Sequence, residues 1–163
     1  MFSANAKLPE QCKIVQGLAP ITPSTSTPDY VSLKNYARMS VIISCDNAAT
    51  VTGSAITLKQ ATAVAGTAEK ALGFDNYYAN LDTGAADTLA LTTATSNTFT
   101  TSTVNTKNLL YVLDIEASDL DVDNGFDCVR VGTANAVNTV VDVVYILYPP
   151  RYSSPAAVAA ITD

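Results

Sequence analysis

Apolar and polar residues alternate along most of this chain, and the pattern is densest in residues 125–148, GFDCVRVGTANAVNTVVDVVYILY. In the second half of that stretch, one face of an extended strand carries Val141, Val143, Tyr145 and Leu147, and the other carries Val140, Val144 and Ile146. A strand that is apolar on both faces is buried on both faces. Residues 126–131 are similarly apolar. The stretch therefore predicts two paired strands, joined by the loop 132–138, at the centre of a sheet.

Shorter stretches predict the remaining strands, and residues 36–45 and 54–61 among them show the same period of two. They are residues 36–45, 54–61, 68–74, 88–92, 97–102 and 108–116. Residues 36–61 predict an antiparallel pair that turns at residues 46–53, while the threonine-rich segments 88–92 and 97–102 predict outer or edge strands. About eight strands at spacings of roughly ten residues, with no convincing helix, predict an all-β fold, an antiparallel β-sandwich that is most like a jelly roll.

Proline interrupts both ends of the chain and divides it into three parts. Residues 1–29, with Pro9, Pro20, Pro23 and Pro28, predict an extended N-terminal arm that makes few hydrogen bonds to the sandwich. Its apolar residues leave two interpretations open, a floppy tail and an arm that docks on a neighbouring subunit. Residues 30–148 are predicted to form the β-sandwich domain, and residues 149–163 an extended C-terminal tail, because Pro149, Pro150 and Pro155 stop the ladder.

The composition suits one domain with few surface charges. At 163 residues the chain is long enough to bury a proper core. Charged residues make up only 15%, against the ~25% usual in globular proteins, which indicates a surface partly covered by partners. The net charge of −6, with basic residues scattered singly, argues against nucleic acid as a partner. No apolar run is long enough to cross a bilayer and the first residues lack a secretion signal, so we expect no membrane partner either.

Cysteine and tyrosine are predicted to serve packing rather than chemistry. Cys12, Cys45 and Cys128 lie far apart without CxxC spacing, which indicates neither a disulfide framework nor a zinc site. Cys45 and Cys128 are interpreted as small buried hydrophobes. The tyrosines are not interleaved with basic residues as in an oligonucleotide platform, so they are predicted to be core or interface anchors.

A group of aspartates in residues 118–127, SDLDVDNGFD, superficially resembles a calcium loop. Its members are Asp119, Asp121, Asp123 and Asp127. An EF-hand loop needs glycine at its sixth position and glutamate at its twelfth, and counting from Asp119 these positions hold Asn124 and Arg130. The departures favour a solvated turn in which Ser118 caps a single helical turn.

No catalytic constellation is visible. The chain has no histidine, which excludes Ser-His and Cys-His nucleophile pairs. Glu10, Glu69 and Glu116 are isolated, and nothing in their spacing indicates the paired carboxylates of a glycosidase. No glycine-rich loop joins a strand to a helix to hold phosphate. We therefore expect no enzyme activity, no catalytic, cofactor-binding or metal-binding residue, and no cofactor.

Several stretches taken together resemble a family of structural proteins from tailed bacteriophages. They are KLPEQCKIVQGLAPI, DYVSLKNYARMSVIIS, ITLKQATAVAGTAEKALGF, GFDCVRV and VVYILYPPRYSSP, and they cover nearly the whole chain. The resemblance implies a β-rich auxiliary head protein that decorates or cements the capsid. No functional residue is carried over from the family.

The resemblance also implies a location and partners. The protein would be made in the cytoplasm of the host bacterium and bind the outside of the capsid, bridging subunits of the major capsid protein, itself as a homo-oligomer such as a dimer or trimer. Two alternatives stay open: a tail or head–tail joining component, and a carbohydrate-binding β-sandwich on the particle. The absence of tryptophan counts against the second alternative.

Overall fold

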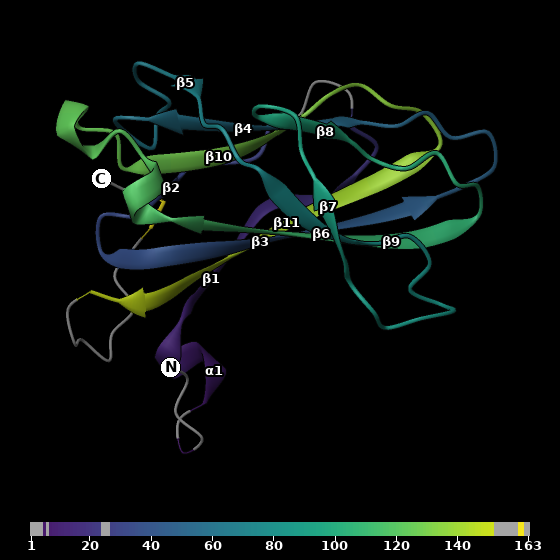
Figure 1. The fold of residues 1–163 in the computed structure, drawn as a ribbon, viewed down its shortest axis with the longest axis horizontal. Coiled ribbons are helices and arrows are strands. Elements are labelled where there is room, and N and C mark those ends of the chain that lie inside the picture. The colour runs from purple at the N-terminus through teal and green to yellow at the C-terminus, as the bar shows by residue number, and fades with distance from the viewer. Residues whose placement is uncertain (1–4, 6, 24–26, 152–159, 162–163) are drawn as a thin grey trace.

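The computed structural model describes residues 5, 7–23, 27–151 and 160–161, and it consists of two antiparallel sheets packed face to face (Figure 1). The predicted all-β sandwich is confirmed. The elements are α1 (Leu8–Gln11), β1 (Lys13–Ile21), β2 (Val31–Ser32), β3 (Tyr36–Asn47), β4 (Ala55–Ala61), β5 (Lys70–Ala71), β6 (Asn76–Asn80), β7 (Ala90–Thr93), β8 (Thr98–Thr100), β9 (Lys107–Glu116), the 3-10 turns η1 (Ala117–Asp119) and η2 (Val122–Asn124), β10 (Cys128–Thr133) and β11 (Thr139–Pro150).

The larger sheet has six strands in the order β1-β11-β3-β9-β6-β7. Its long central strands are registered along almost their whole lengths, β11 with β3 and β3 with β9. The smaller sheet has five strands, in the order β2-β10-β4-β5, with β8 also paired to β4. The threonine-rich segments form β7, at the edge of the larger sheet, and the short β8, as the sequence predicts.

Several consecutive strands lie in different sheets instead of pairing as hairpins, although β4 pairs with β5 and β6 pairs with β7. β10 lies in the smaller sheet and β11 in the larger, so the prediction that residues 125–148 form one hairpin is wrong, although each strand has a partner on both sides. The predicted antiparallel pair in residues 36–61 is wrong for the same reason, because β3 and β4 lie in different sheets. These crossings between the two sheets bear on jelly-roll connectivity, which stays a prediction.

The core lies between the sheets, and tyrosine hydroxyls cross it to satisfy backbone groups. The Tyr145 ring is fully buried and its Oη accepts the backbone N–H of Val131 at 3.1 Å. β2 pairs with β10 only at Cys128 and Val129, so beyond the end of β2 the Tyr145 hydroxyl is the acceptor for the β10 backbone. Tyr111 Oη likewise accepts the Ser102 N–H at 2.8 Å. The tyrosine prediction therefore holds for these two rings as core anchors.

The N-terminal segment is part of the sandwich. The prediction that residues 1–29 make few hydrogen bonds to it is wrong for β1, which pairs with β11 from Lys13 to Ile21. The registers shift after Gln16 and after Leu18, so β1 carries bulges or irregularities. Gly17 lies directly over Tyr145, where a Cβ would come within 2.3 Å of the ring. A side chain at that position would therefore push β1 off the sheet.

Three smaller predictions need correction. Pro149 and Pro150 do not stop the ladder, because β11 continues to Pro150, which faces Tyr36 of β3. The tail prediction for residues 152–159 and 162–163 lies outside the described residues, but Ala160 is buried and its carbonyl accepts the N–H of Ser32 at 2.7 Å. The predicted strand at residues 68–74 shrinks to β5, which has only two residues.

Candidate functional site

The four aspartates of residues 118–127 make separate local contacts. Asp119 accepts the backbone N–H of Glu116 at 2.8 Å, which makes Glu116 the N-cap of η1 and places Ser118 inside the turn, so the predicted Ser118 cap is wrong. Asp121 pairs with Lys70 and accepts the Asn124 amide. Asp127 accepts a hydrogen bond from the Cys128 thiol at 3.1 Å. Among the described residues no group of acidic or cysteine side chains is arranged to hold a metal ion.

The three isolated glutamates also have separate roles. Glu10 accepts the Lys7 N–H at 2.9 Å and Glu116 pairs with Arg38. Glu69 is bound by Lys59, Arg130 and the Tyr30 hydroxyl. None of these contacts joins one glutamate to another.

The cysteines are buried thiols. All three are free and buried, as the sequence predicts for Cys45 and Cys128. Burial raises the pKa of the Cys45 thiol to about 12, which keeps it protonated and unreactive at neutral pH.

The outer face of the smaller sheet is covered by paired charges. Arg130 of β10 and Lys59 of β4 face each other across the ladder and both bind Glu69, which lies between β4 and β5 in the chain. The Arg130 guanidinium lies over the Tyr30 ring, with Cζ 4.8 Å from the ring centroid. The Tyr30 hydroxyl donates a hydrogen bond to Glu69 at 2.6 Å. The hydrogen bonds from Lys59 and Tyr30 hold the pKa of Glu69 below its ordinary value. Both basic side chains of this face are therefore bound to a carboxylate, although Arg130 Nε has no hydrogen-bond partner.

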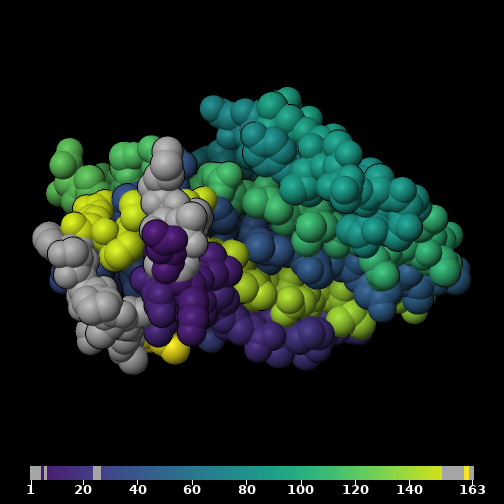
Figure 2. Space-filling view, turned by 90° about the horizontal axis from the view of Figure 1, so that it is seen from below, coloured from purple at the N-terminus to yellow at the C-terminus, as the bar shows by residue number. Residues whose placement is uncertain are grey.

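The outer face of the larger sheet is different, because apolar side chains form a row across it. Val144 of β11 faces Ile42 of β3, Ile42 faces Val112 of β9, Val112 faces Tyr78 of β6, and Tyr78 faces Leu91 of β7. Directly opposed residues in an antiparallel ladder project on the same face with Cβ atoms ~5 Å apart, so these five side chains are neighbours. We call them the apolar row. Figure 2 shows this face, with the strands in order from purple β1 to teal β6 and β7.

The apolar row is open to solvent, most of all at its β6–β7 end. Tyr78 is 40% exposed and Leu91 61% exposed, while the other three members are half-buried among their neighbours. The prediction that β11 is buried on both faces is therefore wrong for its outer face, where Val140 is 37% exposed and Val144 and Ile146 are half-buried. The apolar residues that predicted a second buried face instead line a partly exposed one.

Carboxylates flank the apolar row on both sides. Asp114 lies two residues beyond Val112 on β9, and Asp142 two residues before Val144 on β11, so both project on the same outer face. Asp46 of β3 lies further along this face. None of these three takes part in an ion pair with another described residue, whereas Arg38, the basic residue that the described registers place on this face, is bound to Glu116. The face is therefore acidic around an apolar centre.

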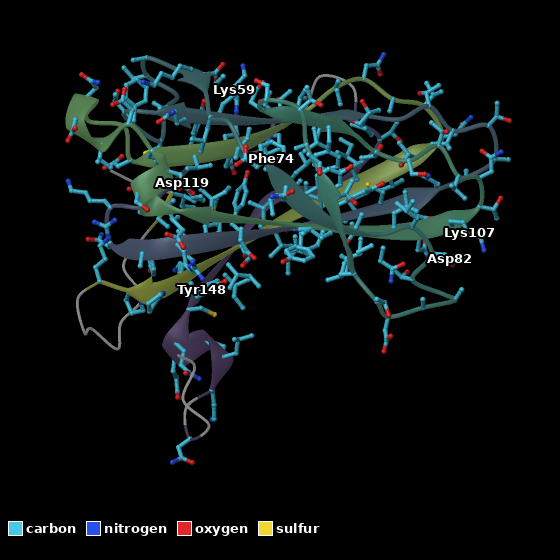
Figure 3. The ribbon with its side chains drawn as sticks, viewed as in Figure 1. Lys59, Phe74, Asp82, Lys107, Asp119 and Tyr148 are labelled. Atoms are coloured by element: carbon cyan, nitrogen blue, oxygen red, sulfur yellow. The ribbon has the colours of Figure 1, made fainter. Side chains whose placement is uncertain are left out.

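A groove of about 580 Å³ opens beside the exposed end of the row, where β6 leaves β9. β6 is registered with β9 only at Tyr78, Ala79 and Asn80, so the two strands diverge before the next opposed positions, Asn76 and Asp114. We call this the acidic groove. Its lining includes the carboxylates Asp75, Asp114 and Asp119 and the apolar side chains Leu72, Phe74, Tyr78 and Leu91. Phe74 and Asp119 are labelled in Figure 3.

The sequence alone does not reveal this site. Leu91 and Tyr78 lie in segments with weak or no period, and Asp114 lies in a strand whose alternation predicts only an outward position. Only the register across β11, β3, β9, β6 and β7 brings the row together. The carboxylates that did attract attention, apart from Asp119, lie outside the acidic groove.

The described residues form a β-sandwich whose larger sheet carries the apolar row and exposed carboxylates on its outer face. No family model matches the chain, and no curated protein matches it either. Among solved structures, the chain is similar to a protein described as "SPBc2 prophage-derived protein YomS", with 12% identity and a TM-score of 0.47 over 84% of this chain and 93% of that one. A likeness of this size carries no functional argument. No helix in the described part of the chain is long and apolar enough to span a membrane.

Proposed function

We propose that this protein is a structural component of a tailed-phage virion that binds the outside of the capsid through the outer face of its larger sheet. The partner is the major capsid protein, whose subunits it bridges and stabilises, and the role requires no catalysis. The observation that carries the proposal is the apolar row. The sequence stretches that resemble phage structural proteins supply the context.

The apolar row favours protein binding because an antiparallel sheet that faces water normally places polar side chains outward. Here each of five adjacent strands instead contributes an apolar side chain to one continuous line. A contiguous apolar patch with a polar rim is typical of a protein-binding surface, and single scattered apolar residues are not. The ladders of β11, β3 and β9 hold the row rigidly, so binding orders little additional chain.

The charges around the apolar row agree with a protein partner. Asp46, Asp114 and Asp142 repel nucleic acid, which suits a location outside a DNA-filled capsid. The same charges oppose a homodimer in which two copies of this face meet. A homo-oligomer on the capsid, as a dimer or trimer, would therefore associate through another surface.

A capsid cement acts through many modest contacts. Each interface of ordinary size has a limited affinity, but a copy that touches two capsid subunits gains from the high effective concentration of the second contact. Heating then has to break many such bridges together. The proposal therefore predicts a protein present in many copies per particle, unlike a head–tail joining protein, which forms one ring.

Binding to capsids that lack the protein tests the proposal. Leu91→Lys places a charge in the most exposed position of the apolar row, and we expect binding to weaken by about tenfold or more, since an apolar contact of the interface is replaced by a charge. Val122→Lys is the matched control, because Val122 is 53% exposed in η2, outside the row. It should bind as the unmodified protein does.

The copy number per virion and the heat resistance of decorated capsids complete the test. Hundreds of copies and a loss of heat resistance with Leu91→Lys alone would support a cement. A few copies per particle would favour the joining component, and equal binding by both variants would show that the face is not the interface.

A further inference from the structure

The acidic groove has two walls of different chemistry. One wall comes from the connection between β5 and β6 and from the β6–β7 pair, with Leu72, Phe74 and Leu91 as apolar lining. The other comes from the end of β9 and from η1, with Asp114 and Asp119. Asp75 adds a third carboxylate beside Phe74. The groove is therefore lined by apolar carbon and negative charge together.

Two of the groove carboxylates are held by hydrogen bonds, and none of the three is paired with a described basic side chain. Asp114 accepts a hydrogen bond from the Ser40 hydroxyl, and Asp119 accepts the Glu116 N–H at 2.8 Å. Asp75, Asp114 and Asp119 are all exposed, and none forms an ion pair with a described basic residue. This contrasts with Asp82, Asp121 and Glu116, which each pair with a lysine or arginine. Figure 3 labels one of these pairs, Asp82 and Lys107.

The shape of the groove favours an extended segment. Residues 113–116 of β9 are registered with β3 on one side, and no β6 residue is registered with them on the other. Tyr78 and Leu91 belong both to the groove and to the apolar row, so a partner seated on the row is carried directly to the groove. Lysine and arginine side chains fit such a surface, because their stems cover apolar carbon while their charged ends reach carboxylates.

We propose that the acidic groove binds a basic, extended segment of the protein that docks on the apolar row, and that its three carboxylates select that partner. This inference rests on the proposed function for the identity of the partner. A second copy of this chain is a poor occupant, since its net charge is −6 and its corresponding face is acidic. The groove thus makes the outer face of the larger sheet, the docking face, selective for a partner of opposite charge.

A short synthetic peptide in which lysine and leucine alternate tests the groove without any virion component. Its binding to the full chain is followed by amide chemical shifts, with the same peptide carrying glutamate in place of lysine as the negative probe. We expect shifts in residues 72–78 and 113–119 for the lysine peptide, and weaker binding as salt rises. The glutamate peptide should produce none.

Two triple variants separate groove charge from total charge. Asp75→Asn with Asp114→Asn and Asp119→Asn keeps a side-chain oxygen to accept the bonds from Ser40 and Glu116, so the fold is retained. It should weaken peptide binding by about tenfold, as expected for three exposed charge contacts. The control makes the same charge change at exposed positions outside the groove, Asp29→Asn with Asp87→Asn and Asp123→Asn. It should bind as the unmodified chain does.

Each other result overturns the inference. Peptide shifts outside the groove, or equal binding by both triple variants, would show that the groove carboxylates do not recognise a basic segment. Calcium alone causing the same shifts and raising the melting temperature would make the groove a cation site instead.

Capsid binding distinguishes a failure of this inference from a failure of the proposed function. If the groove triple variant binds capsids as well as the unmodified chain while Leu91→Lys does not, the docking face stands and the groove inference is wrong. If the unmodified chain ignores capsids but binds the lysine peptide in the groove, the groove inference stands and the capsid is the wrong partner.

Discussion

Replacing Tyr145 with phenylalanine removes one oxygen atom from the centre of the sandwich. That oxygen, Oη, accepts the Val131 N–H at 3.1 Å, and both residues are fully buried. The ring itself stays, so the packing against Gly17 of β1 is preserved. The substitution therefore isolates the hydrogen bond between β11 and β10, which joins the two sheets.

The expected loss follows from the fate of the Val131 amide. β2 is registered with β10 only at Cys128 and Val129, so β2 offers no acceptor to the Val131 N–H. Leaving a buried donor without a partner costs ~1–3 kcal/mol of the free energy of unfolding. For a domain of this size each kcal/mol lowers the melting temperature by ~2–4 °C, so we expect a fall of roughly 2–12 °C.

Thermal melting by circular dichroism, supported by urea denaturation, measures this loss. The matched control is Tyr148→Phe, on the same strand but facing outward, where the hydroxyl contacts Ser40 Oγ at 2.7 Å (Figure 3). That side chain is half-buried, and water can replace the contact, so its loss should stay within about 0.5 kcal/mol. If Tyr145→Phe melts at the same temperature as the unmodified protein, or if Tyr148→Phe is destabilised as much, the hydrogen bond between Tyr145 and Val131 does not stabilise the sandwich as proposed.

Three further predictions follow from the same core. Gly17→Ala should cost ~1–3 kcal/mol in urea denaturation, because its Cβ collides with Tyr145; unchanged stability would show that β1 shifts freely. Deleting residues 1–22 should destabilise or unfold the chain by removing an edge strand, and a truncated protein that melts like the full chain would restore the arm interpretation. Burial raises the pKa of the Tyr111 hydroxyl to about 12, from ~10 in the unfolded chain. The stability that this shift contributes is therefore complete below pH ~10 and is lost as the pH rises towards 12. Tyr111→Phe should flatten this decline in the free energy of unfolding, measured by urea titration at each pH.

The strands themselves were largely predictable from the sequence. β3, β4, β9, β10 and β11 fall on stretches where inward apolar residues alternate with outward polar or weakly apolar ones. Period-two alternation reports which side chains share a face of one strand. It contains no information about which strand lies alongside, and so the two predicted hairpins were wrong while their strands were right.

β1 was missed for a different reason. Its register shifts after Gln16 and after Leu18, which breaks the period, and it contains Pro20, which is tolerated because β1 is an edge strand with one free side. Sequence patterns treat both features as signs of an irregular segment. In the folded chain β1 packs closely on Tyr145 at Gly17, where only a residue without a side chain fits.

The docking face could not be predicted because a sequence pattern does not show which strands are neighbours. Its apolar row takes one side chain from each of five strands, so no single stretch of sequence contains more than one member of it. Within each strand, an outward valine or isoleucine resembles a core residue, which is why β11 was predicted to be buried on both faces. The acidic groove adds Asp75, Asp114 and Asp119 from three separate elements or connections. A surface assembled across strands in this way can change its partner through single outward substitutions, because the inward residues that hold the sandwich together are different ones.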